Sequence, residues 1–421
     1  MSKSRDRLVE PMTITNDILF LGRQPILDRD QSVVAYELLF KSGTINNTET
    51  TDDIPAISTV INHAFTELGV ESALGPYGGF ITMNDSLLMS DVVEILPASK
   101  IVIEIPETVQ ISEQLMARCA ELKQMGFTLA LDNFTHDDPE ARALLDLVDI
   151  VKIDLVTVDH STLEALVARV KEWPVQVLAE HVDSLELLDL CMRLGFDLFQ
   201  GYFFARPHIA SGKPLSQSRP ILLKLLSQVT TDADIDDIVA TLQQYPSLSI
   251  NLLRLTNSAA SGIQHKVTSL ASAITILGRR QLQKWILILL YSENPGNSNT
   301  SHPLLQLAAR RGKLMEILAS TQRDKAFEET AFMIGILSLM DALLGLPMDE
   351  ILTSISVSTE VADALASRAG SLGKLLTLVE NLESGSMENI NACLHTSAYI
   401  SLHDISLAQA GSLQWVNAIK A

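Results

Sequence analysis

The first half of the chain alternates short apolar runs with stretches of helical periodicity. Each run has the length of a buried strand, and most are separated by enough residues for one helix. Gly126 and Gly195 come directly before two of the runs, as expected of glycines that end helices. The pattern predicts an α/β fold with a parallel barrel, and an open doubly wound sheet is the alternative. The apolar runs are 18–22, 33–40, 79–83, 101–105, 127–131, 149–153, 175–179 and 196–199, and the helical patterns include 55–74, 108–125, 139–147, 161–172 and 184–194.

The pattern changes after residue 207. The stretch 208–220 is rich in Ser, Pro and Gly and is expected to link two domains, 18–207 and 221–421, behind an N-terminal extension, 1–17. From residue 221 onward the periodicity is helical and no strand alternation is convincing, so the second domain is expected to be all-α. Its predicted helices are 221–229, 235–242, 248–257, 269–277, 280–290, 304–320, 328–344, 348–352, 359–366, 373–383, 387–394 and 398–410.

Polar side chains stand within or at the end of the apolar runs of the first domain. They are Gln24, Glu37, Asn84, Glu104, Asp132, Lys152 with Asp154, Glu180 and Gln200. A closed parallel barrel brings its strand ends to one face, where active sites of such barrels lie. Carboxylate and amide oxygens there are hard ligands suited to Mg²⁺ or Mn²⁺, and Lys152 could hold or polarise an attacking water. Taken singly, each residue is better explained as a solvated strand end, and only the set as a whole favours a functional site.

The order of short motifs in residues 18–207 resembles that of EAL domains, the barrels of cyclic di-GMP phosphodiesterases. The matching pieces are RQPILD (23–28), YELLF (36–40), MND (83–85), EIPE (104–107), LDNF (131–134), VKID (151–154), LAEHV (178–182) and FQGYFFARP (199–207). The resemblance implies a metal-dependent site for cyclic di-GMP. It assigns catalytic positions to Lys152 and Glu180, nucleotide-binding positions to Gln24 and Gln200, and support of a nearby loop to Glu107. It assigns metal positions to Glu37, Asn84, Glu104 and Asp132, with Asn133 at the position of the second metal.

The departures from the EAL pattern are concentrated around Asn133. This residue replaces an aspartate, so a second Mg²⁺ or Mn²⁺ should bind more weakly to its uncharged amide. The loop 135–139 has lost its glycines and gained Pro139, so it cannot follow the family's path. Losing one metal of a two-metal clamp removes several kcal/mol of transition-state stabilisation, and each ~1.4 kcal/mol is a tenfold loss of rate. The barrel is therefore expected to be weakly active or inactive, with vestigial catalytic residues, and the alternative is an active phosphodiesterase. Whether cyclic di-GMP is bound is left open.

The second domain resembles HDOD domains, relatives of HD-type phosphohydrolases without their metal ligands. The resemblance is carried by LLRLTNSAASG (252–262), HKVTSLASAITILGRRQLQKWILI (265–288) and AFMIGILSLMDALLGLPMDEIL (331–352). Together the two domains resemble EAL–HDOD regulators of the YuxH type, which implies a signalling protein whose HDOD domain contacts protein partners or regulates the barrel. Two basic clusters, Arg279 with Arg280 and Lys284, and Arg310 with Arg311 and Lys313, are expected on solvated helix faces, with partner docking as the alternative.

Charge and composition narrow the function classes. Lys plus Arg number 31 against 51 Asp plus Glu, a formal charge of −20, which disfavours nucleic acid as a partner. Neither a signal peptide nor an apolar run long enough for a membrane span is found, so a cytoplasmic protein without membrane contact is expected. Three widely separated cysteines are expected to be buried, reduced side chains. The sequence leaves the oligomeric state open, a homo-oligomer included.

Overall fold

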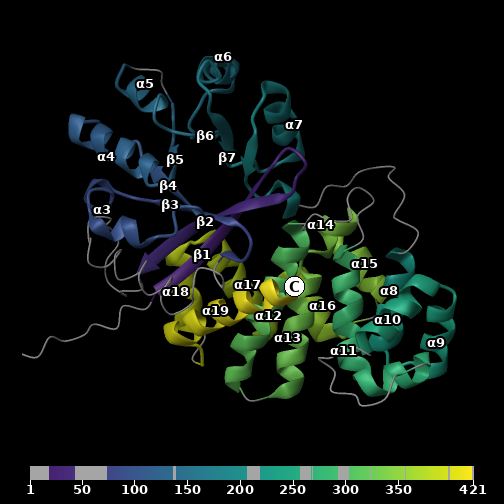
Figure 1. Ribbon diagram of the computed structural model, residues 1–421. Helices are drawn as coiled ribbons and strands as arrows, with labels where there is room; N and C mark the ends of the chain where they lie inside the picture. Colours follow the sequence, from purple (N-terminus) through teal and green to yellow (C-terminus); the bar gives the residue numbers. More distant parts are fainter. Residues whose placement is uncertain are drawn as a thin grey trace, which may run out of the picture.

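Eight strands close into a barrel in chain order (Figure 1). The computed structural model describes residues 19–42, 74–135, 139–205, 219–256, 267, 269–292, 303–322, 324–355, 357–396 and 399–419. The strands are β1 (Leu19–Leu27), β2 (Val33–Ser42), β3 (Gly78–Thr82), β4 (Ile101–Ile105), β5 (Thr128–Leu131), β6 (Ile150–Asp154), β7 (Gln176–Glu180) and β8 (Leu198–Gln200). The predicted α/β barrel is confirmed, and the open sheet is excluded.

The prediction of a wholly parallel barrel is wrong at the first strand. β1 runs antiparallel to both β2 and β8, whereas the pairs from β2 to β8 are parallel. The cause is the connection 28–32, which is too short for the crossover helix that parallel neighbours need. Asp28 stabilises this turn, since its Oδ1 accepts from the N–H groups of Asp30 at 3.0 Å and Ser32 at 2.9 Å. β1 and β2 therefore form a hairpin that closes the barrel.

Helices follow the parallel strands and cover the outside of the barrel. They are α3 (Asp85–Leu88), α4 (Glu113–Gln124), α5 (Pro139–Leu145), α6 (His160–Val170) and α7 (Leu185–Leu194), with 3-10 turns η1 (Asp91–Ile95) and η2 (Phe203–Ala205). Ser112 and Ser184 cap α4 and α7, each accepting at 3.2 Å from a backbone N–H three residues on. Gly195, with φ of 91°, ends α7 as its sequence position predicts. Most of the predicted helix 55–74, like residues 136–138, lies outside the described residues.

The elements of the second half are all helices in the described residues, as predicted. Its helices are α8 (Arg219–Thr230), α9 (Ile235–Gln243), α10 (Pro246–Thr256), α11 (Leu270–Ser292), α12 (Pro303–Ala319), α13 (Lys325–Leu337), α14 (Met340–Leu344), α15 (Met348–Ile355), α16 (Thr359–Ser367), α17 (Gly370–Ser384), α18 (Met387–Thr396) and α19 (Leu402–Ile419), with η4 (Ser320–Gln322). The single helix predicted over 328–344 is wrong, because the chain breaks between α13 and α14. α11 bends at Gly278, where φ is 78° and ψ is 154°.

The two halves share apolar packing. α17 and α19 contact β1 (Figure 1), while α12 and α14 contact η2 at the end of the barrel domain. Leu413 on α19 belongs to the apolar cluster of the barrel, and Phe204 on η2 packs against the helical core. The barrel and the helical domain are therefore in direct contact through α12, α17 and α19.

The expectation of solvated faces is wrong for two of the basic residues. Arg310 and Arg311 are 4% and 6% exposed, because α12 packs against α13, α17, α19 and η2. Arg279, Arg280 and Lys284 instead line a pocket of roughly 530 Å³. Each of the three forms an ion pair with a carboxylate, at a distance between 2.6 and 2.9 Å. The partners are Asp232, Glu329 and Glu316, respectively.

No helix among the described residues is by itself long and apolar enough to cross a membrane. The bent pair Lys325–Leu344 and Met348–Ile355, with 120° between its halves, meets the length and composition criterion only when taken together. Met340 and Ile351 of this pair are buried in the helical core, which accounts for its apolar composition.

Candidate functional site

The interior of the barrel is built in two layers. The lower layer is an apolar plug to which each strand contributes one side chain: Ile26, Ala35, Phe80, Val102, Ala130, Ile150, Leu178 and Leu198. Because side chains alternate along a strand, the next inward position lies two residues further toward the site end of the barrel. These positions are Gln24, Glu37, Thr82, Glu104, Asp132, Lys152, Glu180 and Gln200. All eight positions of the second layer are thus polar, and seven of them are predicted site residues.

Lys152 is the centre of this polar layer. Its Nζ lies 2.6 Å from Oε1 of Glu104 and 2.9 Å from Oε1 of Glu180. It also lies 3.3 Å from Oδ1 of Asp132 and 3.6 Å from Oε2 of Glu37. The Lys152 side chain is 1% exposed, so one buried ammonium gathers carboxylates from four other strands or strand ends.

Burial and charge together set the protonation of the layer. Burial raises the pKa of Glu104 to about 8 and that of Glu180 to about 7, against the opposing effect of the Lys152 charge. Burial disfavours the charge on Lys152, but the surrounding carboxylates outweigh it and hold the pKa of the ammonium well above its ordinary value. Four carboxylates against one ammonium leave three surplus negative charges when all are ionised. The layer therefore retains protons or attracts cations.

Amide groups complete the layer on the side of the hairpin. Gln24 on β1 lies directly opposite Glu37 on β2. Nε2 of Gln200 donates to Oε1 of Gln24 at 3.0 Å and also to Oε2 of Glu37. Oε1 of Gln200 is buried and has no hydrogen-bond partner among the described residues, so this amide keeps an acceptor for a ligand. We refer to Gln24, Glu37 and Gln200 as the hairpin wall.

Thr82 is the member of the layer that sequence reasoning missed. Its hydroxyl donates to Oε2 of Glu104 at 2.8 Å, which fixes the carboxylate on the side away from Lys152. The signal for it was available, since Thr82 follows the inward-facing Phe80 by two residues.

Three other predicted residues lie outside this cluster. Asn84 follows β3 and caps α3, with its Oδ1 accepting from the N–H of Leu87 at 3.0 Å. Asn133 follows Asp132 in a left-handed conformation, with φ of 47°, and its Oδ1 accepts from the hydroxyl of Thr157 at 3.3 Å. Glu107 is exposed after β4, and part of the loop it is predicted to support lies outside the described residues.

The donor chemistry fits a hard divalent cation, but the arrangement is occupied by Lys152. Carboxylate oxygens are the ligands that Mg²⁺ and Mn²⁺ prefer, and the surplus negative charge favours binding. Within the described part of the chain, no three His, Cys, Asp or Glu side chains stand together in a geometry that could hold a metal ion. A metal bound here must share the carboxylates with the ammonium of Lys152.

Comparison with known proteins assigns both halves of the chain. The EAL domain model matches residues 82–207, and the HDOD domain model matches residues 218–348. The chain is 30% identical over 404 residues to "Uncharacterized protein YuxH" of Bacillus subtilis. These residues cover 94% of this chain and 98% of that protein. The chain belongs to the EAL–HDOD family. Six of the eight positions of the polar layer lie within the EAL match, whereas Gln24 and Glu37 precede it, and α15–α19 extend past the HDOD match.

Two further proteins are similar to this EAL–HDOD chain. "Cyclic di-GMP phosphodiesterase CdgJ" of Vibrio cholerae is 29% identical over 411 residues, which cover 96% of this chain and 94% of that protein. The solved structure of Klebsiella pneumoniae BlrP1 in a complex with manganese and cyclic di-GMP has a TM-score of 0.37 and 20% identity. That likeness covers 46% of this chain and 57% of that one.

Proposed function

We propose that the chain is a cytoplasmic signalling protein whose EAL domain binds cyclic di-GMP with a divalent cation and hydrolyses it weakly or not at all. Its HDOD domain contacts a protein partner or a second copy of the chain. Support for the ligand comes from membership of the EAL–HDOD family and from CdgJ, whose name records action on cyclic di-GMP. The roles given to the site residues follow from the same resemblance.

The charge of the polar layer supports a role for Mg²⁺ or Mn²⁺ in ligand binding. Cyclic di-GMP carries two phosphodiester anions, and these meet a layer with surplus negative charge around Lys152. A divalent cation held by carboxylates such as Glu104 and Asp132 would neutralise this repulsion and polarise the phosphate. The Lys152 ammonium stays charged beside them and can orient a water molecule or a phosphate oxygen. The Gln200 amide, with its unpaired acceptor, can bind a donor on the ligand.

The proposal of weak hydrolysis rests on the side chain of Asn133. Its side chain is uncharged, and its oxygen already accepts a hydrogen bond from Thr157. A second cation at this position would therefore gain one carboxylate fewer than in the EAL pattern. Because a two-metal clamp stabilises both the attacking and the leaving oxygen, a weak second site lowers the rate by several factors of ten.

A second candidate is an active cyclic di-GMP phosphodiesterase that the HDOD domain regulates. The Lys152 cluster favours it, because every carboxylate that the resemblance assigns to the first metal and to catalysis is present, and only the second-metal position, Asn133, lacks one. The relative CdgJ, which is similar over almost its whole length, favours it as well. Both candidates require nucleotide binding and differ in turnover.

Titration calorimetry with cyclic di-GMP, with and without Mn²⁺, tests the shared part of the proposal. Binding that requires Mn²⁺ and is lost in Lys152→Ala supports it, and the absence of binding under both conditions overturns it. A product assay with excess Mn²⁺ then separates the candidates. Rapid formation of linear dinucleotide that Lys152→Ala abolishes would favour the active enzyme.

Asn133→Asp tests the cause of weak turnover. If the missing carboxylate is the main defect, this variant binds Mn²⁺ more tightly and raises turnover. Aspartate is compatible with the left-handed backbone of residue 133, so the substitution is expected to fold. Unchanged binding and turnover would assign the defect to the loop 135–139 instead.

Analytical ultracentrifugation tests the proposed contact between copies of the chain. A sedimentation coefficient that rises with concentration supports self-association. A monomer at all concentrations leaves a different protein as the partner of the HDOD domain.

A further inference from the structure

The hairpin wall of the site is joined to the helical domain through Tyr36. This residue precedes Glu37 on β2 and points out of the barrel, because neighbouring side chains of a strand face opposite sides. Its hydroxyl donates to Oε1 of Gln306 on α12, and Nε2 of Gln306 donates to the hydroxyl of Tyr77 at 3.2 Å. Gln306 is 5% exposed, so the contact is fully within the domain interface.

A second tyrosine makes the same connection at the other edge of the wall. Tyr202 follows Gln200 by two residues, and its hydroxyl donates to the backbone oxygen of Glu383 on α17 at 2.9 Å. Its backbone N–H is also fixed, by Oδ1 of Asp183 at 3.3 Å. Both Glu37 and Gln200 are thus within two residues of a side chain that the helical domain holds.

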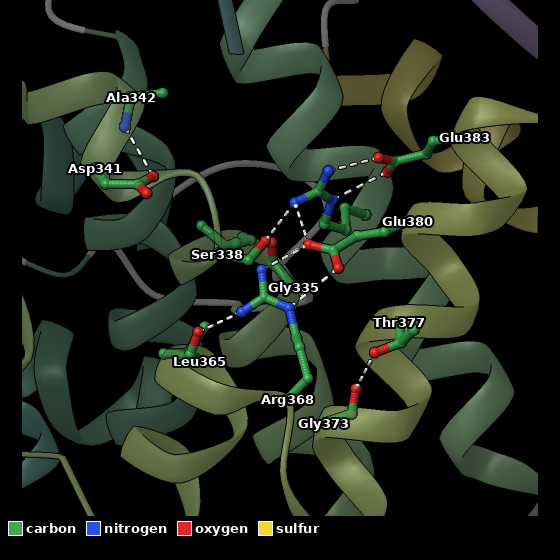
Figure 2. A network of polar contacts seen from close by, with 12 residues as sticks. Gly335, Ser338, Asp341, Ala342, Leu365, Arg368, Gly373, Thr377, Glu380 and Glu383 are labelled. Atoms are coloured by element: carbon green, nitrogen blue, oxygen red, sulfur yellow. Dashed lines mark hydrogen bonds and ion pairs between the residues drawn. The ribbon is translucent and has the colours of Figure 1, made fainter. Parts of the chain in front are cut away.

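The helical end of the Tyr202 connection, Glu383, belongs to a buried network that joins α17 to α12. Glu383 accepts from Nε of Arg311 at 3.1 Å and from Nη2 at 2.5 Å. Nη1 of Arg311 donates to Ser338, in the break between α13 and α14, at 2.8 Å. Figure 2 shows Glu383 in this network beside Glu380, which pairs with Arg368 at 2.8 Å. A shift of α17 against α12 must therefore disturb the ion pairs of Arg311 with both Glu383 and Glu380.

Arg310 is a buried cation that destabilises the closed interface between the barrel and the helical domain. Its side chain is 4% exposed, its Nε is buried without a partner, and its guanidinium forms no ion pair among the described residues. It lies near Arg23, which stacks on the Tyr36 ring at 3.9 Å from the centroid. Burial and the Arg23 charge lower the pKa of Arg310 to about 10. A buried charge without a direct ion pair opposes closure, so the interface can act as a two-state element.

We propose that Gln306 and Glu383 of the helical domain are positioning residues for the nucleotide site, acting through Tyr36 and Tyr202 on the hairpin wall. When the Tyr36–Gln306 and Tyr202–Glu383 hydrogen bonds are formed, which we call the closed contacts, they hold Glu37 and Gln200 in place. When these hydrogen bonds break, the hairpin wall becomes more mobile. By linkage, cyclic di-GMP in the barrel favours the closed contacts, and a partner that moves α12 or α17 changes nucleotide affinity. The nucleotide part rests on the proposed function, whereas the coupling of the wall to the helical domain does not.

The test compares Tyr→Phe variants of the full chain that each remove one hydroxyl. Tyr36→Phe and Tyr202→Phe break the two connections. Tyr291→Phe is the matched control, because its buried hydroxyl donates to the Ile336 oxygen at 2.6 Å inside the helical domain. Hydrogen exchange without ligand is expected to speed up in β1, β2 and β8 of the first two variants and to stay unchanged there in the control. Equal exchange of these strands in all three variants would overturn the proposal.

Calorimetry with cyclic di-GMP and Mn²⁺ gives the second readout. Affinity is expected to fall about threefold to tenfold in Tyr36→Phe and Tyr202→Phe, the loss typical of one hydrogen bond, and to stay at the wild-type value in Tyr291→Phe. If the wild type does not bind the nucleotide, the proposed function fails, and the exchange experiment alone decides the coupling. Normal affinity in both variants, with a wild type that binds, would overturn the coupling.

Arg310→Met tests the proposed strain from the opposite direction. Methionine keeps the length of the side chain and removes the buried charge, so the interface is expected to close more tightly. The variant should unfold at a higher temperature and exchange more slowly in β1 and β2. A lower unfolding temperature together with faster exchange would show that Arg310 stabilises the closed contacts, contrary to the proposal.

Discussion

The Nζ of Lys152 lies 2.6 Å from Oε1 of Glu104, with the two side chains 1% and 0% exposed. Glu104 depends on this pair, since its charge would otherwise be buried without a counter-charge. The hydroxyl of Thr82 holds the other oxygen of Glu104, so the carboxylate has a partner on each side. The pair therefore acts as the fixed centre from which the rest of the polar layer is arranged.

Removing the ammonium is expected to destabilise the barrel. Lys152→Met leaves Glu104 buried without its partner, and the free energy of unfolding should fall by about 3 kcal/mol at pH 8.5. The loss should be smaller at pH 6, where Glu104 can take up a proton. Urea unfolding at both pH values measures it. Lys171→Met is the control, because Lys171 and its partner Asp197 are 32% and 30% exposed and such pairs contribute at most about 1 kcal/mol. Equal losses in the two variants would contradict the central role of the pair.

The raised pKa of Glu104 predicts a pH dependence of stability. Its folded pKa is about 8 against an ordinary value of 4.5, so the folded state binds more protons than the unfolded state between these values. The stability that Glu104 contributes is present below about pH 4.5 and is lost as the pH rises toward 8. Relative to Glu104→Gln, the wild type should lose up to about 1.4 kcal/mol per pH unit between pH 5.5 and 7.5. Urea unfolding without divalent cations checks this, and parallel pH profiles would refute it.

The same protons should compete with a metal. Glu104 and Glu180, with pKa values of about 8 and about 7, must lose their protons before they bind Mn²⁺. The affinity of the wild type for Mn²⁺ is therefore expected to rise between pH 6 and pH 8.5, and the rise should be shallower in Glu180→Gln. Calorimetry at a series of pH values measures both. An affinity independent of pH would mean that these two carboxyl groups do not bind the ion.

Much of the barrel and its polar layer could be predicted because both depend on local patterns. The strands are short apolar runs, and residues such as Glu104 and Lys152 interrupt them at inward positions with a period of two. The direction of β1 could have been read from its connection, since 28–32 has no room for a helix. Thr82 was missed because threonine is common in strands, and only its spacing of two residues from the inward-facing Phe80 marks it as a member of the layer.

The domain interface could not be predicted, because it depends on contacts between distant residues. Tyr36 and Gln306 are 270 residues apart, and Tyr202 and Glu383 are 181 apart. No periodicity in either half relates such positions. Arg310 was assigned to a solvated face because arginine is rarely buried, and only the packing of α12 on several sides reverses that expectation.

Gly201 is expected to be irreplaceable beside the site. A Cβ at this position would lie 2.0 Å from the backbone oxygen of Val182, so the chain after Gln200 would have to move. Gly201→Ala should lower the free energy of unfolding by on the order of 2–4 kcal/mol and displace Gln200. Gly195→Ala is the control, because its Cβ would meet nothing within 4 Å and only the strain of φ at 91° remains, about 1 kcal/mol. Urea unfolding of both variants tests the difference, and similar values would show that the backbone of Val182 yields easily.

The crossing of α12 and α13 predicts opposite effects of two helical Gly→Ala substitutions. A Cβ on Gly335 would lie 2.6 Å from the Cα of Gly312, backbone against backbone, so the helices would have to separate. Overpacking of this kind costs about 1–3 kcal/mol, which exceeds the gain of about 1 kcal/mol from replacing a helical glycine by alanine. A Cβ on Gly411 would meet only the end of the Ile317 side chain at 3.0 Å, which can rotate away. Thermal unfolding should therefore show a lower midpoint for Gly335→Ala and a higher one for Gly411→Ala. Because α12 also carries Gln306, Gly335→Ala should speed hydrogen exchange in β2 as well. Unchanged exchange in β2 would show that the packing of α12 on α13 does not affect the hairpin wall.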